Sequence, residues 1–473
     1  MNAALKRVNF AVLWIAALIM TSPAWLVGLQ FEKSEYAARR QKLMERISDG
    51  AAVILGAPSG NQSHDFYYLT GVEVPDAVLF VDAKKKESVI FYTISERAAR
   101  EAGLSLDFVR DPVGTTGVER WLPAEQFNNF LAQRFYSYLY RQKSAREQEI
   151  ATLYTPFKPG SIGELTGNLR QMTRNSWDGR VSREVMFARH LQDEFPQLNV
   201  KDCTEIIWEL RLIKSPAEVE VMRKTARIRV KALLETMKST RPGMREYELA
   251  GLFGFLSKKE GAQDPVFQPI ISSGENHEFV HYNKNDRLLE DGDFIVFDGG
   301  PAYGYYHTDI SISFPVNGKF SPRQRDMYEA CLAVSKACLS IYRPGLTCMD
   351  VGEQAHDVLK KKGYDLSKDV FQKLRFFNEG GCTHPVGLDG HDAGGADLDY
   401  CGTLKPGMVF ACDVFATYPA EKLGVRVENT VLITEKGCEN LTVFPREISE
   451  IEALMKTKGI IQLIKEAGLY DLK

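Results

Sequence analysis

The stretch that decides the fold is FIVFDGGPAYGYYHTDISISF, which runs from Phe294 to Phe314. Two apolar, β-branched and aromatic runs flank a short Gly- and Tyr-rich connection, a pattern that predicts a β-hairpin. The first run ends on Asp298 and the second opens on Asp309, so both aspartates are expected near the closed end. A carboxylate that ends an apolar strand is costly to bury unless its charge is compensated, and a metal ion is one such compensator. Aspartates are also common in turns, so the hairpin alone leaves both interpretations open.

The length and composition of the chain set limits on what it is. At 473 residues it exceeds one ordinary core, so two large domains are expected. Apolar residues make up 44% and charged residues 26%, as in soluble globular proteins. The net charge of −3 gives no basic footprint, which argues against nucleic acid as a partner. All eight cysteines lie at or after Cys203 without C-x-x-C spacing, which argues against a zinc knuckle and leaves disulfide pairing undetermined.

The N-terminus has the pattern of an export signal. Lys6 and Arg7 precede an uncharged stretch from Val8 to Leu29, and Ser22-Pro23-Ala24 places small residues for cleavage after Ala24. Residues 1–24 are therefore predicted to be a signal peptide. The stretch is also long enough to cross a bilayer, so the alternative is an uncleaved anchor to about residue 29. In both cases the protein is expected outside the cytoplasm, periplasmic or secreted, and at a membrane only if the segment stays uncleaved.

Residues 31–205 are predicted to form a smaller α/β domain, because strands alternate with helices and favour a mixed sheet. The segment from Arg110 to Ser182 is rich in Gln, Arg, Tyr and Asn and is interpreted as helices and an insertion without chemistry. His64 and His190 have no partners nearby in the sequence and are predicted to be structural or surface residues. The elements expected here are a helix over Tyr36–Ile47 and strands over Ala51–Leu55, Ala77–Val81 and Ser88–Tyr92.

Residues 215–473 are predicted to form an α+β domain. Ser215 is a good N-cap and Pro216 suits the first helical position, so a helix is expected to open the domain. The expected helices are Ala217–Met237, Glu246–Glu260, Ser321–Tyr342, Cys348–Lys362 and Ile448–Ala467, with strands at Gln268–Ser272 and Asp293–Asp298 before the hairpin.

Five candidate metal ligands recur in order along this half of the chain. Asp298, Asp309, His384, Asp413 and Glu428 each lie on or beside a strand-like segment. The four negative charges balance two divalent cations, and the oxygen-rich set favours manganese first, with cobalt or zinc as alternatives. Two ions about 3.5–4 Å apart can share a bridging water and lower its pKa. Scattered acids at strand ends can equally form a solvated rim, so the residues alone leave that alternative open.

Together with their surroundings, these residues resemble a known family. The sequence is similar to metallopeptidases with the pita-bread fold, which include aminopeptidase P and prolidase. The resemblance rests on SSGENHEFVHY, on the hairpin and the residues that follow it, and on HPVGLDGHD, KPGMVF and GVRVENTVLIT. Residues 31–205, with FYYLTG, resemble the creatinase-type N-terminal domain of aminopeptidase P, prolidase and creatinase. The resemblance implies a pita-bread catalytic domain after that smaller domain.

The resemblance also implies a role for each metal ligand. Asp298 would chelate one metal ion, and Asp309 and Glu428 would bridge both ions. His384 and Asp413 would complete the second site.

Three further residues match positions that act on the substrate or support the ligands. His281 matches the histidine that binds substrate and steadies the intermediate, and His391 matches the one near the scissile bond. Arg426 matches an arginine that orients the bridging carboxylate. These three are the predicted catalytic residues.

Three positions depart from the family pattern. Asp413 stands where the family has Glu, one methylene longer, so a weaker second metal site is expected. Gly380 replaces a common histidine, and Ile312 replaces a common arginine.

The resemblance therefore predicts a metal-dependent Xaa-Pro aminopeptidase, which releases the first residue from peptides with proline second. A tertiary amide lacks an N–H and proline fixes the local backbone, so a dedicated pocket is plausible. The first alternative is a prolidase limited to Xaa-Pro dipeptides, and the second is a non-catalytic peptide-binding relative with a weakened metal site. A creatinase-like hydrolase without metal would not need this ligand set. A peptide substrate and a homo-oligomer are the expected partners.

Overall fold

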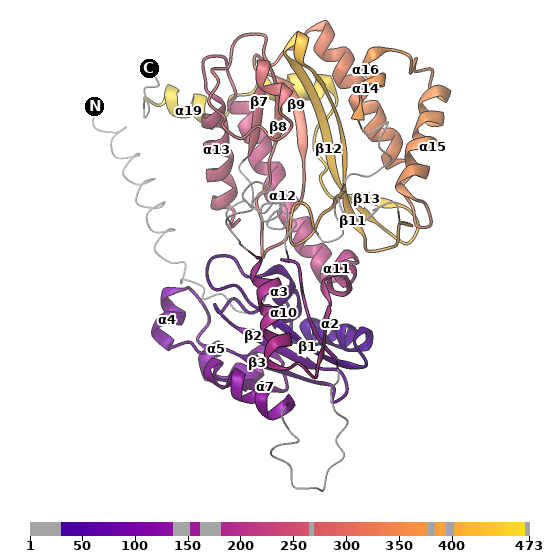
Figure 1. The fold of residues 1–473 in the computed structure, drawn as a ribbon. Coiled ribbons are helices and arrows are strands. Elements are labelled where there is room, and N and C mark those ends of the chain that lie inside the picture. The colour runs from indigo at the N-terminus through magenta and orange to yellow at the C-terminus, as the bar shows by residue number, and fades with distance from the viewer. Residues whose placement is uncertain are drawn as a thin grey trace, which may run out of the picture. The chain divides into compact units, whose positions relative to one another are not determined.

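The computed structural model describes residues 30–135, 152–160, 181–263, 269–375, 384–392 and 402–468 (Figure 1). The predicted export segment, residues 1–24 or to about 29, lies outside this described part of the chain. The chain divides into two compact units, Met1–Lys158 with Val181–Thr204 and Pro159–Arg180 with Glu205–Lys473.

The first unit is built on a mixed six-stranded sheet of order β4-β3-β2-β1-β5-β6. The central strand β1 pairs antiparallel with β2 and parallel with β5. The edge strands β4 and β6 pair parallel with β3 and β5, respectively. The predicted α/β character of this unit is confirmed. The strands are β1 Gly50–Leu55, β2 Val78–Asp82, β3 Glu87–Phe91, β4 Arg120–Leu122, β5 Thr152–Thr155 and β6 Asn199–Asp202.

Short helices accompany this sheet. The prediction that 110–182 holds only helices and an insertion is wrong, because β4 and β5 lie in it and complete the sheet. His64 is buried at the start of α3 and His190 is exposed on α10. The helices are α2 Lys33–Arg46, α3 His64–Thr70, α4 Glu96–Glu101, α5 Asp107–Arg110, α6 Pro112–Thr116, η1 Ala124–Gln126, α7 Phe127–Phe135 and α10 Arg183–Glu194.

The second unit contains two antiparallel sheets. One has the order β7-β8-β9 and the other the order β10-β11-β12-β13. Ser313 Oγ on β9 accepts a hydrogen bond from the backbone N–H of Arg426 on β12 at 2.8 Å, which ties the two sheets together. The strands are β7 Ile270–Ser273, β8 Phe294–Asp298, β9 Ser311–Pro315, β10 His384–Pro385, β11 Val409–Tyr418, β12 Leu423–Ile433 and β13 Cys438–Asn440.

Helices cover both sides of these sheets, as Figure 1 shows: α12 and α13 lie on the side of β7, and α14 and α15 on the side of β11 and β12. Ser215 and Pro216 cap and open α12 as predicted. The predicted helix 448–467 is two helices, α18 and α19, with Gly459 as the N-cap of the second. The elements are α11 Thr204–Leu212, α12 Pro216–Ser239, α13 Glu246–Lys259, η2 Gly274–Glu278, α14 Pro322–Leu339, α15 Cys348–Lys361, α16 Asp369–Gln372, η3 Pro419–Glu421, α18 Ile448–Met455 and α19 Ile460–Glu466.

The predicted hairpin is confirmed. β8 and β9 pair antiparallel with Phe294 opposite Pro315 and Asp298 opposite Ser311. Every residue of both strands is buried, as expected of strands covered on two faces. The second strand starts two residues later than the sequence pattern indicates, so Asp309 lies in the connection just before β9.

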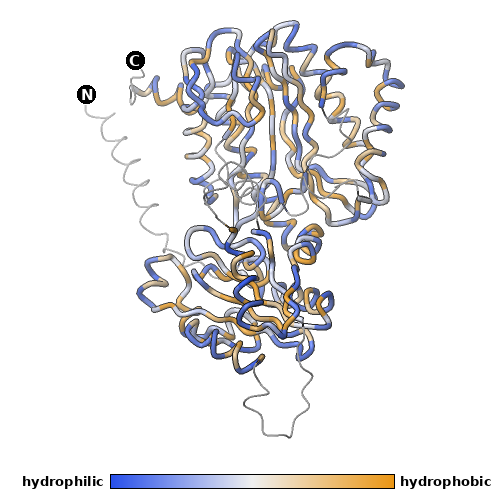
Figure 2. Tube along the Cα trace, in the orientation of Figure 1, coloured by the Kyte–Doolittle hydropathy of each residue, from blue (hydrophilic) through white to orange (hydrophobic). Residues whose placement is uncertain are grey.

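Apolar residues hold each unit together. Figure 2 shows the hydrophobic residues concentrated along strands and inner helix faces, with hydrophilic residues on the turns between them. In the second unit, one cluster of buried side chains joins β8, β9, β11, β12, α12, α14 and α15. The six cysteines in the described residues are free thiols.

Candidate metal centre

The strands of the second unit bring four carboxylates together. Asp298 ends β8, and Asp413 and Glu428 are direct cross-strand partners on β11 and β12. The backbone of Asp309 is held by Thr430, whose Oγ1 accepts from the Asp309 N–H at 2.7 Å and donates to its carbonyl at 2.8 Å. The four residues are at most 4% exposed. Such a cluster is costly to bury without compensating cations.

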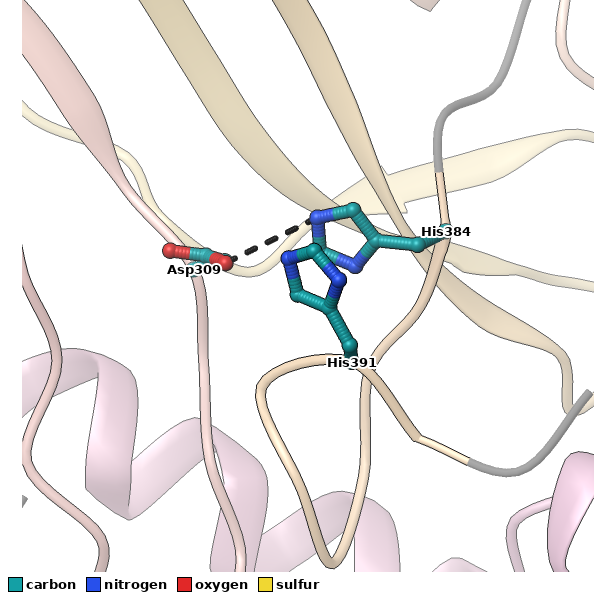
Figure 3. Close-up of side chains that lie close together, drawn as sticks. All are labelled: Asp309, His384 and His391. Carbon is teal, nitrogen blue, oxygen red and sulfur yellow. Dashed lines mark ion pairs between the residues drawn. The ribbon is translucent and has the colours of Figure 1, made fainter. Parts of the chain in front are cut away.

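His384 faces two of these carboxylates from β10 (Figure 3). Its Nδ1 lies 3.2 Å from the carbonyl of Pro385, and its Nε2 points the other way. Nε2 is 3.7 Å from Asp309 Oδ2 and 3.8 Å from Glu428 Oε1. With Nδ1 as the donor to Pro385, Nε2 carries a lone pair, as a metal-binding imidazole requires.

Three buried atoms at this point have no hydrogen-bond partner among the residues that the structure describes. They are His384 Nε2, Glu428 Oε1 and Asp298 Oδ1. A buried polar atom without a partner costs free energy, and three on metal-ligating groups point to a cation. Ligands bound at about 2.1 Å to one ion lie about 3–3.5 Å apart, close to the spacings of the His384 nitrogen from the two oxygens. The residues therefore fit a divalent metal ion.

The other two predicted histidines lie at the open side of the centre. The ring of His391 stacks on that of His384, with ring centroids 3.8 Å apart and 20° between the planes (Figure 3). A ligand atom of His391 also lies within 4.8 Å of those of Asp309 and His384. His391 and His281 both reach solvent. The side of the His391 ring that stacks on His384 is shielded from water, which lowers the pKa of His391.

Arg426 occupies the middle of the carboxylate cluster. Its Nε and Nη2 donate to the two oxygens of Asp413 at 2.9 and 2.7 Å, a forked pair. Its Nη1 donates to Asp298 Oδ2 at 2.7 Å, and Nη2 is 3.7 Å from Glu428 Oε2. Burial opposes the positive charge, but the carboxylates outweigh it and raise the pKa of Arg426 above its usual value. Asp413 thus faces an arginine and belongs to neither of the metal-ligand groups found in the described residues.

A second buried arginine, Arg229, was not predicted from the sequence. It lies on α12 and its side chain is 1% exposed. Its Nη2 is 3.3 Å from Asp309 Oδ1 and 3.6 Å from Asp298 Oδ1. Nη2 also donates to the carbonyl of Ile310, and Nη1 donates to that of Thr308. Its position in the sequence could have revealed it. Arg229 falls on the buried face of α12, where the other residues are mostly apolar or small.

The two remaining departures from the family pattern have different outcomes. Ile312 is fully buried within β9 and packs in the apolar core of the unit. Gly380 lies outside the described residues.

A buried ion triad anchors the loop that carries His384 and His391. The carboxylate of Asp392 accepts from Arg211 Nη2 at 2.5 Å and from Lys214 Nζ at 3.2 Å, and all three side chains are 1% exposed. The Asp392 N–H donates to the carbonyl of Pro385 at 2.9 Å, which closes the loop. A side chain at Gly387 would collide with Asp392, so the glycine is needed for this approach.

Burial and mutual repulsion leave the carboxylates electrostatically strained. Burial, with the charge of Asp298, raises the pKa of Asp309 to about 7. Burial also raises the pKa of Glu428 and lowers the pKa of the His384 imidazole well below its usual value. The negative charge of the cluster thus exceeds what the two arginines neutralise.

Comparisons with known proteins show which families and structures the chain resembles. Residues 220–435 match the sequence model of metallopeptidase family M24, and residues 36–137 match that of the aminopeptidase P N-terminal domain. An Xaa-Pro aminopeptidase of Escherichia coli is 31% identical over 90% of this chain and 98% of its own length. A rat Xaa-Pro dipeptidase is 33% identical over 65% of this chain and 71% of its own. The E. coli aminopeptidase P structure superposes with a TM-score of 0.72 at 28% identity, covering 90% of this chain and 98% of that one.

Proposed function

The chain belongs to metallopeptidase family M24, and from that premise we propose that it is an Xaa-Pro aminopeptidase, which releases the first residue from peptides with proline second. The observation that carries the proposal is the convergence of His384 Nε2 with oxygens of Asp309 and Glu428, at the centre of the fold shared with aminopeptidase P. Manganese is our first choice for the metal, with cobalt or zinc as alternatives, because the donors are mainly carboxylate oxygens.

The metal ligands, His281 and His391 would each have a separate role in peptide hydrolysis. A divalent ion held by Asp309, His384 and Glu428 would activate water and polarise the scissile carbonyl. His281 can donate a hydrogen bond to the oxygen on which charge develops. His391 is exposed beside the ligands, where its ring can pass a proton to the leaving proline nitrogen.

Apolar side chains lie close to Arg426. A cavity of about 20 Å³ next to Arg426 is lined in part by Phe279, Phe415 and Val296. Phe279 is 58% exposed. It offers an apolar wall against which a substrate side chain can pack.

The test is hydrolysis of an Xaa-Pro-Xaa tripeptide by the purified protein, after chelation and with Mn²⁺, Co²⁺ or Zn²⁺ restored. Release of the first residue only with metal is expected, and a matching peptide with alanine second should be cut poorly. The His384→Ala variant should lose at least about 100-fold in kcat/KM, because even outer contacts to metal ligands are worth 10–100-fold. Absence of cleavage with every metal would refute the proposal and favour a non-catalytic peptide-binding protein.

A prolidase is the second candidate, because the similarity to the rat Xaa-Pro dipeptidase covers 65% of the chain. The same assay separates the two functions. Cleavage of Xaa-Pro dipeptides with no cleavage of the tripeptide would favour the prolidase.

We also propose that the protein is exported, on the strength of Lys6, Arg7 and the apolar stretch that ends near Ala24. Among the described residues, no helix has the length and hydropathy needed to span a membrane. N-terminal sequencing of protein from the native host should begin at Trp25, and an intact N-terminus in the membrane fraction would favour the anchor. The homo-oligomer expected from the family stays a prediction, which sedimentation of the purified protein would test.

A further inference from the structure

Asp309 and Glu428 are the two carboxylates that face His384. In each of them, one oxygen faces His384 and the other faces a different partner. Asp309 turns Oδ2 toward His384 and Oδ1 toward Arg229. Glu428 turns Oε1 toward His384, while its Oε2 accepts from Ser311 Oγ at 2.6 Å and faces Arg426. Among the described residues, no positively charged side chain pairs with the oxygens on the His384 side, whereas Arg229 and Arg426 face those on the opposite side.

Of the other two carboxylates, only Asp413 is fully bonded to an arginine. Asp298 bonds Arg426 through Oδ2, while its Oδ1 has no hydrogen-bond partner among the described residues and stays grouped with oxygens of Asp309 and Glu428. Both oxygens of Asp413 accept hydrogen bonds from Arg426, which leaves neither aimed at His384. Asp298 lies between the two guanidinium groups, at 2.7 Å from Arg426 Nη1 and 3.6 Å from Arg229 Nη2. Buried guanidinium–carboxylate forks of this kind are strong and geometrically specific.

The position of Arg229 is built into the fold. A side chain at Gly300 would meet Arg229 Nη1 and the carbonyl of Thr308, so the glycine opens the path by which the arginine reaches the cluster. Arg229 is fixed by three acceptors: the carbonyls of Thr308 and Ile310, and Asp309. It is therefore a fixed part of the centre.

The charges then balance for one divalent ion. When all four carboxylates are ionised, as metal binding requires of the ligands, they face two guanidinium groups, which leaves two negative charges at the centre. A third buried arginine, Arg446, bonds the backbone carbonyl of Glu428 at 2.8 Å, and within the described part of the chain it forms no ion pair with the four carboxylates. We propose that Arg229 and Arg426 take the place of a second cation, so that the centre binds a single divalent ion between Asp309, His384 and Glu428. The inference rests on the proposed function only for the presence of metal.

The decisive experiment counts metal ions per chain. The protein as isolated is chelated, equilibrated with excess Mn²⁺, freed of unbound ion by gel filtration and measured by elemental analysis, with calorimetric titration alongside. One ion per chain is expected, with the same result for Zn²⁺ and Co²⁺. Two ions per chain of similar affinity would refute the single-ion centre and leave the peptidase function standing. No bound ion would refute the metallopeptidase function and this inference with it.

A matched pair of variants locates the ion. Asp309→Asn and Asp413→Asn make the same chemical change on two carboxylates of equal burial. The first should abolish the bound ion, because Asp309 faces His384, and the second should keep one ion per chain, because Asp413 faces Arg426. Loss of the ion in both variants would place Asp413 among the ligands and refute the inference.

Removing an arginine tests its role as the second cation. Arg229→Met keeps an unbranched apolar stem and takes away one positive charge 3.3 Å from Asp309. We expect affinity for a second ion to rise on the order of ten-fold or more. Arg40→Met is the control, since Arg40 is equally buried but bonds only backbone carbonyls in the first unit. If both variants fold and bind a second ion with equal affinity, the role of Arg229 is refuted. If Arg229→Met fails to fold, the number of metal ions per wild-type chain decides the proposal.

Discussion

Replacing Asp392 by asparagine should destabilise the second unit strongly. Asp392 is the only carboxylate bonded to both Arg211 and Lys214 among the ion pairs of the described residues, and the three side chains are 1% exposed. Asparagine keeps the shape of the side chain but removes its charge, which takes away the carboxylate that the two buried cations share. Breaking a buried pair in this way costs about 3–5 kcal/mol. Because His391 directly precedes Asp392, activity should fall as well.

The free energy of unfolding is measured with guanidinium chloride, and amide hydrogen exchange of residues 384–392 shows whether the loop itself opens. The matched control is Asp369→Asn. Asp369 pairs with Arg323 at 2.7 Å, but the two side chains are 52% and 32% exposed, so this loss should stay below about 1 kcal/mol.

The comparison between the two variants decides the reasoning. If Asp392→Asn costs no more than Asp369→Asn, and exchange in the loop is unchanged, the triad does not hold the loop. The position of His391 would then need another cause.

Three further predictions concern single residues of the second unit. Burial lowers the pKa of His277 to about 4, so the unfolded chain takes up a proton between pH 6.5 and 4 that the folded chain cannot. As the pH falls through that window, wild type should lose about 3 kcal/mol of unfolding free energy relative to His277→Gln. An equal pH dependence of the unfolding free energy in the two proteins would contradict this. Ser311→Ala removes the donor to Glu428 Oε2 and should weaken Mn²⁺ binding about 10–100-fold by calorimetry, with unchanged affinity as the contrary result. Gly300→Ala should displace Arg229 and cost about 1–3 kcal/mol, and a variant as stable as wild type would show that the arginine can move aside freely.

Local patterns in the sequence predicted the elements that carry the metal ligands. Alternating apolar runs around the Gly-rich connection predicted the hairpin of β8 and β9, because strand pairing over a short connection is a local property. Ser215 and Pro216 predicted the start of α12 for the same reason, since capping involves only neighbouring residues. The family resemblance then supplied the order of the ligands, which the structure gathers at one point.

Short or interrupted elements were harder to predict. β4 and β5 were missed because strands of three and four residues show too little alternation to distinguish from a loop. One helix was predicted where α18 and α19 form two, because Gly459 is an N-cap here and a single glycine does not always end a helix.

The sequence by itself determined the family, the two kinds of domain and most of the side chains that meet at the centre, with Arg229 as the exception. Only the tertiary structure decided what each of them faces. Arg229 reads as an ordinary charged helix residue until packing places it under Asp309, and Asp413 reads as a metal ligand until Arg426 is seen to fork onto it. The reason is physical: which carboxylate is compensated by arginine and which is left for a metal depends on distances of a few ångströms between separate strands and helices, and no local pattern encodes those distances.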